Sequence, residues 1–186
     1  MNCRPTIQLA SGTYFDFERP LLGPEALSDI AHALSNLCRF TGHTSQFYSV
    51  AEHSVHVSHL VPPAMALVAL MHDAPEAFIG DVAKPLKELL PDYKRIEDRI
   101  EAAVFAHFNL PLPLPAAVKE ADRVMLATEQ AQAMHSADIW RHTHGKKAAQ
   151  IKLHFWSPDE AFRQFIWRFR DLQPLPYRHP ATSIGE

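Results

Sequence analysis

Apolar residues recur at helical spacing along most of this chain. The segment 24–40 shows the pattern through four residues on one helical face: Leu27, Ile30, Leu34 and Leu37. Residues 64–73 are apolar nearly all round, so we expect them to form a central, buried helix. The same reasoning predicts further helices over 49–61, 85–90, 92–108 and about 115–134, and a last helix that begins near Ser157.

Prolines and capping residues set two of the expected helix ends. Ala74 precedes Pro75 and is biased away from helical geometry, which predicts a break just after Asp73. The last helix begins with a capping-box pattern formed by Ser157, Pro158 and Glu160. Residues 6–22 favour irregular or short extended structure, but helical periodicity outweighs strand alternation overall. The sequence therefore predicts an all-α fold.

The length and composition predict one globular domain. The chain has 186 residues, of which 47% are hydrophobic and 21% charged, values that are ordinary for a protein with a buried core. We expect residues 1–186 to form a single domain, with a core over about 24–172 and a loose tail at 173–186. The segment 135–152 is weakly patterned.

Charge and cysteine content limit the partners and the compartment. A net charge of −3 argues against binding to nucleic acid polymers. No apolar run approaches the roughly 18 residues of a membrane span, and the first residues show no signal-peptide pattern. Cys3 and Cys38 have no metal-type spacing and argue against a disulfide scaffold. We therefore expect a cytoplasmic protein without a membrane partner.

The pair His72-Asp73 directly follows the apolar run 66–71, where packing gives no reason for an imidazole beside a carboxylate. Adjacent helical residues point about 100° apart, as the helical repeat requires. Both side chains can reach one ion if the ion lies beyond the helix end or if the backbone turns there. Pro75 favours such a turn.

His53 and Asp122 supply two further ligand types from other segments. Asp122 lies on a helical face that is otherwise apolar, with Val118, Ala121 and Met125. A lone buried carboxylate is costly, so Asp122 needs a metal or, alternatively, an arginine partner. A lone histidine on an apolar stripe, such as His53, is more often a core histidine satisfied by hydrogen bonds. Taken together with His72-Asp73, the N/O set suits Zn, Mn, Fe, Co or Mg and indicates a metal-dependent hydrolase.

Two more acids lie near the pair in the sequence. Glu76 falls in an expected first helical turn, where it could accept a proton from the attacking water or simply stabilise the helix N-terminus. Asp81 follows Gly80 and could be a second acid near that water or a turn residue.

Several side chains could meet a phosphorylated substrate. Arg39 can grip a phosphate with two hydrogen bonds, and the neighbouring Phe40 can pack on a sugar or base. Lys87 and Lys119 could also face phosphates, although a single lysine is more often a solvated surface charge.

These residues fall in three strings that resemble a known family. The strings are CRFTGHTSQFYSVAEHS, LMHDAPEAFIGDVAKPLKELLP and VKEADRVMLATE. The resemblance extends around them, from about residue 24 to 134. In this order they resemble the HD superfamily of metal-dependent phosphohydrolases. Within it they are similar to the branch of bacterial 5′-deoxynucleotidases and small phage-type dNTP triphosphohydrolases.

The resemblance implies an all-helical HD-domain bundle, a homodimer or larger assembly, and a role for each matched residue. It implies His53, His72, Asp73 and Asp122 as ligands of a divalent metal ion. It implies Glu76 and Asp81 as acids at the attacking water, and Arg39, Phe40, Lys87 and Lys119 as substrate contacts. Phe40 stands where the deoxynucleotidases have Trp, and the spacing from Arg39 to His53 is slightly shorter.

We therefore expect metal-dependent release of phosphate from a small deoxynucleotide, with dNMP as the substrate. A dNTP triphosphohydrolase and a cyclic nucleotide phosphodiesterase are the alternative enzymes, and a nucleotide-binding module without activity is the alternative outside catalysis. The ligand set admits Co, Mn, Mg, Zn or Fe and does not select among them.

Overall fold

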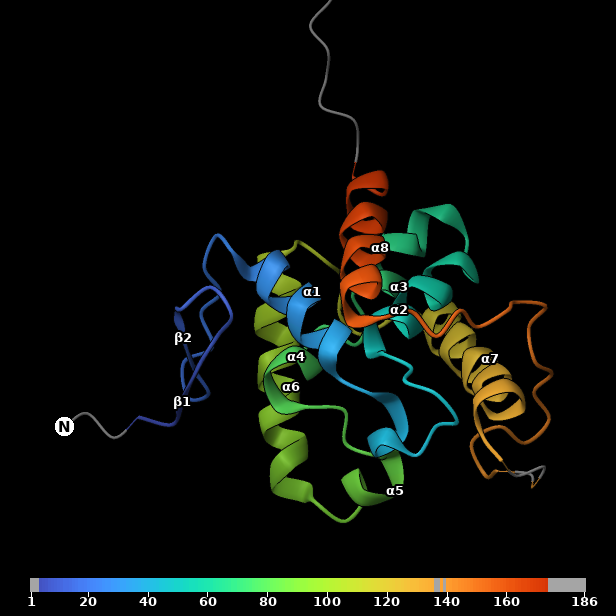
Figure 1. Cartoon of the computed structure of the whole chain (residues 1–186). Helices are drawn as coiled ribbons and strands as arrows, with labels where there is room; N and C mark the ends of the chain where they lie inside the picture. The colour runs from blue at the N-terminus through green and yellow to red at the C-terminus, as the bar shows by residue number, and fades with distance from the viewer. Residues whose placement is uncertain (1–3, 136–137, 139, 174–186) are drawn as a thin grey trace, which may run out of the picture.

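Helices make up nearly all of the regular structure in the part of the chain described by this computed structural model, residues 4–135, 138 and 140–173. The all-α expectation is confirmed, with one small addition of two strands (Figure 1). The helices are α1 (Ala26–Asn36), α2 (Val50–His59), α3 (Ala66–Leu70), α4 (Glu76–Ile79), α5 (Lys84–Lys87), α6 (Pro91–His107), α7 (Ala116–Ala133) and α8 (Pro158–Asp171).

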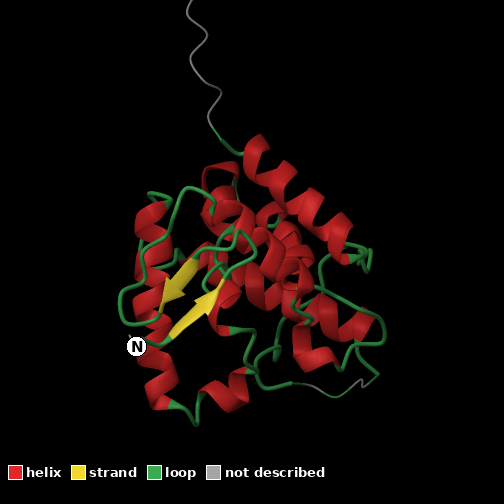
Figure 2. Ribbon diagram, turned by 60° about the vertical axis from the view of Figure 1, so that its left-hand side comes forward, coloured by secondary structure: helices red, strands yellow, loops and turns green. Residues whose placement is uncertain are grey.

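The two strands form a hairpin near the N-terminus. Strands β1 (Thr6–Gln8) and β2 (Tyr14–Asp16) pair antiparallel, with Ile7 opposite Phe15 (Figure 2). The ring of Phe15 stacks on Phe78 of α4 at 4.1 Å between centroids. The hairpin therefore extends the hydrophobic core to residues before 24.

The centre of the bundle is shared by α2 and α3. Every residue of α2 from Val50 to Ser58 is buried, as are Ala66 and the last three residues of α3. Ser49 begins α2 by accepting a hydrogen bond from the Glu52 amide at 3.1 Å. The predicted central buried helix is thus confirmed, but the His-Asp pair that it was expected to carry lies after its end.

The helix predicted over 64–73 is shorter in the structure and does not include His72 and Asp73. A 3-10 turn (Pro63–Met65) precedes α3, and α3 ends at Leu70, with Met71 as its C-terminal cap. The Ala74 amide then donates to the Met71 carbonyl at 3.0 Å, and Pro75 has no amide hydrogen with which to continue a helix. The pair consequently lies in a turn, where adjacent side chains can converge.

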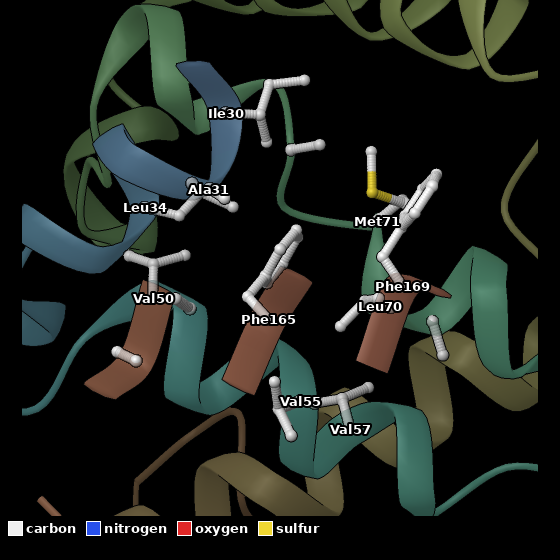
Figure 3. Close-up of a cluster of buried hydrophobic side chains, with 14 of the residues drawn as sticks. Ile30, Ala31, Leu34, Val50, Val55, Val57, Leu70, Met71, Phe165 and Phe169 are labelled. Carbon is white, nitrogen blue, oxygen red and sulfur yellow. The ribbon is translucent and has the colours of Figure 1, made fainter. Parts of the chain in front are cut away.

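The last helix, α8, covers the two central helices α2 and α3. Helix α8 packs on α1, α2 and α3, and its Phe165 and Phe169 insert among the apolar side chains of those elements (Figure 3). A capping bond from the Glu160 amide to Ser157 Oγ, at 3.3 Å, confirms the predicted start. The tail expected at 173–186 lies, apart from Gln173, outside the described residues.

The residues just before α8 are anchored by a buried carboxylate. Glu52, fully buried on α2, accepts hydrogen bonds from the backbone amides of His154, Phe155 and Trp156 at 2.7–3.0 Å. Because an unpaired buried carboxylate is costly, these three bonds tie the C-terminal third to the helix that carries His53.

Candidate metal centre and active site

Three predicted metal ligands converge at one point from three separate elements. His53 comes from α2, His72 from the turn after α3, and Asp122 from α7. One ligand atom of each lies within 4.8 Å of the other two. Such a cluster of two imidazoles and a carboxylate could hold a divalent cation.

Asp73 joins the same cluster. Its Oδ2 lies 3.3 Å from His72 Nε2 and 3.5 Å from His53 Nε2, while Asp122 Oδ1 lies 3.3 Å from His53 Nε2. The structure therefore brings all four predicted ligands together. The turn of residues 71–74 lets two neighbours face one point.

The tautomer of His72 is fixed by its backbone. Its Nδ1 lies 2.7 Å from the carbonyl oxygen of Ala69, which can only accept a hydrogen bond. The proton therefore stays on Nδ1, and the Nε2 lone pair points into the cluster.

His53 is held in the same way by a residue that sequence reasoning did not assign. Its Nδ1 lies 2.5 Å from Oε1 of Glu129, which is fully buried on α7. Glu129 follows Asp122 by two helical turns and ends the third matched string, so helical spacing from Asp122 was the available signal.

The two imidazoles fit a shared cation. His53 Nε2 and His72 Nε2 lie 3.3 Å apart, and both rings use Nδ1 as the donor to an oxygen. Two facing lone pairs repel unless a positive charge lies between them. The residues present therefore match a divalent metal ion by donor type, direction and charge.

The carboxylates around His53 also favour a positive charge in the cluster. Burial and Arg39 lower the pKa of His53, but Glu129 and the hydrogen bond with Asp122 outweigh them and raise it to about 10. Burial raises the pKa of Asp122, yet His53, His72 and Arg39 hold it well below the ordinary value. Asp122 is thus ionised and ready to coordinate.

Arg39 lies beside the cluster as a buried cation. It begins a 3-10 turn (Arg39–Gly42), and its NH1 lies 3.5 Å from Asp73 Oδ2 and 3.8 Å from Asp81 Oδ2. Its NH2 donates to Glu129 Oε2 at 3.1 Å. Its buried Nε has no hydrogen-bond partner among the described residues, so it remains a donor for a ligand.

An aromatic pair flanks Arg39. Phe40 and Thr41 both have positive φ, 53° and 56°, a conformation that is costly for residues other than glycine and is often retained at functional sites. The Phe40 ring lies 5.4 Å from the Arg39 guanidinium carbon and 5.6 Å from the Trp140 ring. Trp140 was not singled out by sequence, because its segment has no periodicity.

The two predicted acids, Glu76 and Asp81, lie close enough to Asp73 and Arg39 to interact with their charges. Glu76 begins α4, which ends at Gly80 with a φ of 79° that favours glycine. Burial raises the pKa of Glu76 well above its ordinary value, and Asp73 and Asp81 add to the effect. Its Oε2 is buried without a hydrogen-bond partner among the described residues. Burial also raises the pKa of Asp81.

The two predicted lysines are placed differently. Lys87 Nζ lies 3.3 Å from Glu76 Oε1 and 2.7 Å from Glu97 Oε1. It therefore forms ion pairs with both carboxylates. Lys119 is exposed on α7 and forms no ion pair with a described residue. The structure thus brings Lys87 to the acids and leaves Lys119 outside the cluster's contacts.

The chain is similar to one family model and to several known proteins. The model of the family described as 5′-deoxynucleotidase YfbR-like matches residues 41–141. The uncharacterized protein YfdR of Escherichia coli (strain K12) is 42% identical over 171 residues, which cover 91% of this chain and 96% of that protein.

Two further relatives have lower identity or a shorter match. The uncharacterized protein RCAP_rcc00048 of Rhodobacter capsulatus is 38% identical over 139 residues, 67% of this chain and 71% of its own. The 5′-deoxynucleotidase PM0747 of Pasteurella multocida is 34% identical over 65 residues, 35% of this chain and 33% of its own.

The helical fold and the His/Asp cluster define a phosphohydrolase of the HD superfamily. The chain belongs to the YfbR-like 5′-deoxynucleotidase family. Among the described helices, none has the length and apolar character needed to cross a membrane.

Proposed function

We propose that this enzyme releases phosphate from deoxynucleoside 5′-monophosphates. The observation that carries the proposal is the convergence of His53, His72, Asp73 and Asp122 beside a buried arginine. The match to the YfbR-like family, and to a relative named as a 5′-deoxynucleotidase, supports the substrate class.

The charge balance of the site favours one phosphoryl group over three. Arg39 is the cation nearest the four proposed ligands, and Lys87 already faces two carboxylates. The acids Glu76, Asp81 and Glu129 surround them. A triphosphate would bring more negative charge into this acidic site, where the ion pairs of the described residues already occupy much of the positive charge of Arg39 and Lys87.

His53, His72, Asp73 and Asp122 would hold the metal ion, which when bound supplies Lewis-acid polarisation and a water nucleophile near neutral pH. Glu76 has a free, buried carboxylate oxygen and would hold the attacking water and take its proton. Asp81, near both Arg39 and Asp73, would assist as a second acid.

Arg39 would bind the phosphate through Nε and NH1, while its NH2 stays on Glu129. The Phe40–Trp140 pair would receive the sugar or base. Lys87, beside Glu76, would offset negative charge on the phosphate. Lys119 is exposed and would contact the phosphate only if its side chain extended from the surface toward the site.

We further propose that residues 1–186 act as a single cytoplasmic domain that forms a homodimer or larger assembly. The described hydrophobic core is continuous from Phe15 to Phe169, which supports one domain. Light scattering after gel filtration measures the assembly, and a mass of one chain would contradict the dimer.

A nucleotide panel tests the proposed substrate. The full-length protein is incubated with dNMPs, NMPs, dNTPs and cyclic nucleotides in Mg²⁺, Mn²⁺ or Co²⁺, and phosphate, pyrophosphate and tripolyphosphate are measured. We expect phosphate from dNMPs. Tripolyphosphate from a dNTP would instead support a triphosphohydrolase, and binding without release of any product would contradict an enzyme.

A further inference from the structure

Glu129 is a buried carboxylate whose two oxygens hold residues with different tasks. Its Oε1 accepts the hydrogen bond from His53 Nδ1 at 2.5 Å, and its Oε2 accepts one from Arg39 NH2 at 3.1 Å. The side chain is fully buried, so no water competes for either bond. One group therefore fixes a proposed metal ligand and a proposed phosphate-binding cation together.

The contact with His53 determines where the imidazole points. A hydrogen bond at Nδ1 leaves Nε2 as the coordinating atom and restricts rotation of the ring. His72 Nε2 and Asp122 Oδ1 each lie 3.3 Å from this Nε2. Losing Glu129 would free the ring to turn away from the other ligands.

The contact with Arg39 determines which part of the guanidinium is left for a substrate. NH2 is taken by Glu129, whereas NH1 only approaches Asp73 and Asp81, at 3.5 and 3.8 Å. If Asp73 turns to a metal ion, NH1 loses that partner and Nε has none among the described residues. Glu129 thus binds NH2 of Arg39 and leaves Nε and NH1 for an anion.

The position of Glu129 on α7 adds a geometric link. Asp122 and Glu129 are seven residues apart, so they lie on the same side of the helix, two turns apart. Helix α7 therefore supplies one proposed ligand directly and holds a second one, on α2, through Glu129.

We infer that Glu129 is a positioning residue that couples metal binding to phosphate binding by fixing His53 and Arg39 at once. The inference rests on the proposed metal centre and on Arg39 as a phosphate-binding group. A residue that only neutralised the charge of Arg39 would affect stability and phosphate binding but leave the metal affinity unchanged.

The test is Glu129→Gln in the full-length protein, measured without turnover. Gln offers one carbonyl acceptor where two donors, His53 Nδ1 and Arg39 NH2, each need one. The dissociation constant of Co²⁺ is measured by competition with a chromophoric chelator, and that of inorganic phosphate on the Co²⁺-saturated protein by calorimetry. We expect Co²⁺ to bind about 10- to 100-fold more weakly, as is typical when the partner of a ligating histidine is removed.

We also expect weaker phosphate binding and a changed visible spectrum of bound Co²⁺ in Glu129→Gln. Thr128→Val is the matched control, because Thr128 is equally buried on α7 but its hydroxyl, among the described residues, bonds only to the Val124 carbonyl and the Ala149 amide. It should lower the melting temperature and leave both dissociation constants unchanged. Wild-type values of either constant in Glu129→Gln would overturn the coupling.

A second variant and a separate turnover measurement complete the test. If Glu129→Gln fails to fold, Glu129→Asp retains the charge but shortens the reach, and wild-type affinities for both probes in that variant would overturn the inference. The proposed substrate is tested separately by turnover, so failure to hydrolyse dNMPs leaves the binding result intact. Absence of Co²⁺ binding in the wild type would overturn the metal centre and this inference together.

Discussion

At the residue scale, the site depends on where each ligand atom points. His72 and His53 each use Nδ1 to donate to a fixed oxygen, so both Nε2 atoms face the cluster. Asp73, in the turn after α3, and Asp122, on α7, complete the cluster with carboxylate oxygens. Single substitutions that keep the shape of a side chain but change its charge should therefore separate metal binding from catalysis.

Asp122→Asn removes one negative charge from the proposed ligand set. We expect the affinity for Co²⁺ to fall at least about 10-fold, because an amide oxygen is a weaker ligand than a carboxylate. Chelator competition measures the change. Glu120→Gln, an exposed acid on the same helix, is the control and should bind Co²⁺ like the wild type. Equal affinities in all three proteins would remove Asp122 from the ligand set.

Glu76→Gln should separate chemistry from binding. Glutamine has the shape of the protonated acid but cannot take a proton from water, so we expect kcat to fall about 10²- to 10⁴-fold. The Co²⁺ dissociation constant and KM should change little, because Glu76 is not among the proposed ligands. Steady-state kinetics with a dNMP measure this. A variant with wild-type kcat would show that Glu76 is not the base.

At the scale of elements, the sequence predicted which segments are helical and which face of a helix is buried. Asp122 could be assigned to a buried face because its neighbours are apolar at helical spacing. The turn at 71–74 was placed three residues late, because the apolar run continues to Met71 and hides the end of α3. The position of Pro75 alone marks the break.

Other features depend on contacts distant in sequence. Nothing in the local pattern pairs Glu129 with Arg39, 90 residues earlier, or Glu52 with the amides of 154–156. Trp140 meets Phe40 across 100 residues from a segment without periodicity. Sequence periodicity reports the face of an element that is buried, but it does not report which element buries it.

Helix α8 should be required for the stability of the metal-binding core. Phe165 is fully buried against α1 and α2, so Phe165→Ala should lower the free energy of unfolding by about 3–5 kcal/mol. Trp167→Ala, on the exposed side of α8, should change it by only about 0.5 kcal/mol. Urea denaturation measures both. Equal effects of the two substitutions would contradict the packing of α8 in the core.

At the scale of the whole molecule, metal binding and folding are linked, since the four proposed ligands come from three separate elements. An ion that binds only the folded state stabilises it by about 2.7 kcal/mol at 100 times its dissociation constant. We therefore expect Co²⁺ or Mn²⁺ to raise the melting temperature, and a chelator to reverse the increase. A melting temperature insensitive to both would contradict a site shared among α2, α7 and the turn after α3.

The most direct test of the central claim is phosphate release from a dNMP by the full-length protein, with and without a chelator. We compare the wild type with His72→Ala, which removes a proposed ligand, and with His144→Ala, which removes an exposed histidine. We predict metal-dependent release by the wild type and His144→Ala, and loss of both bound metal and release in His72→Ala. Wild-type metal content and turnover in His72→Ala would contradict the account.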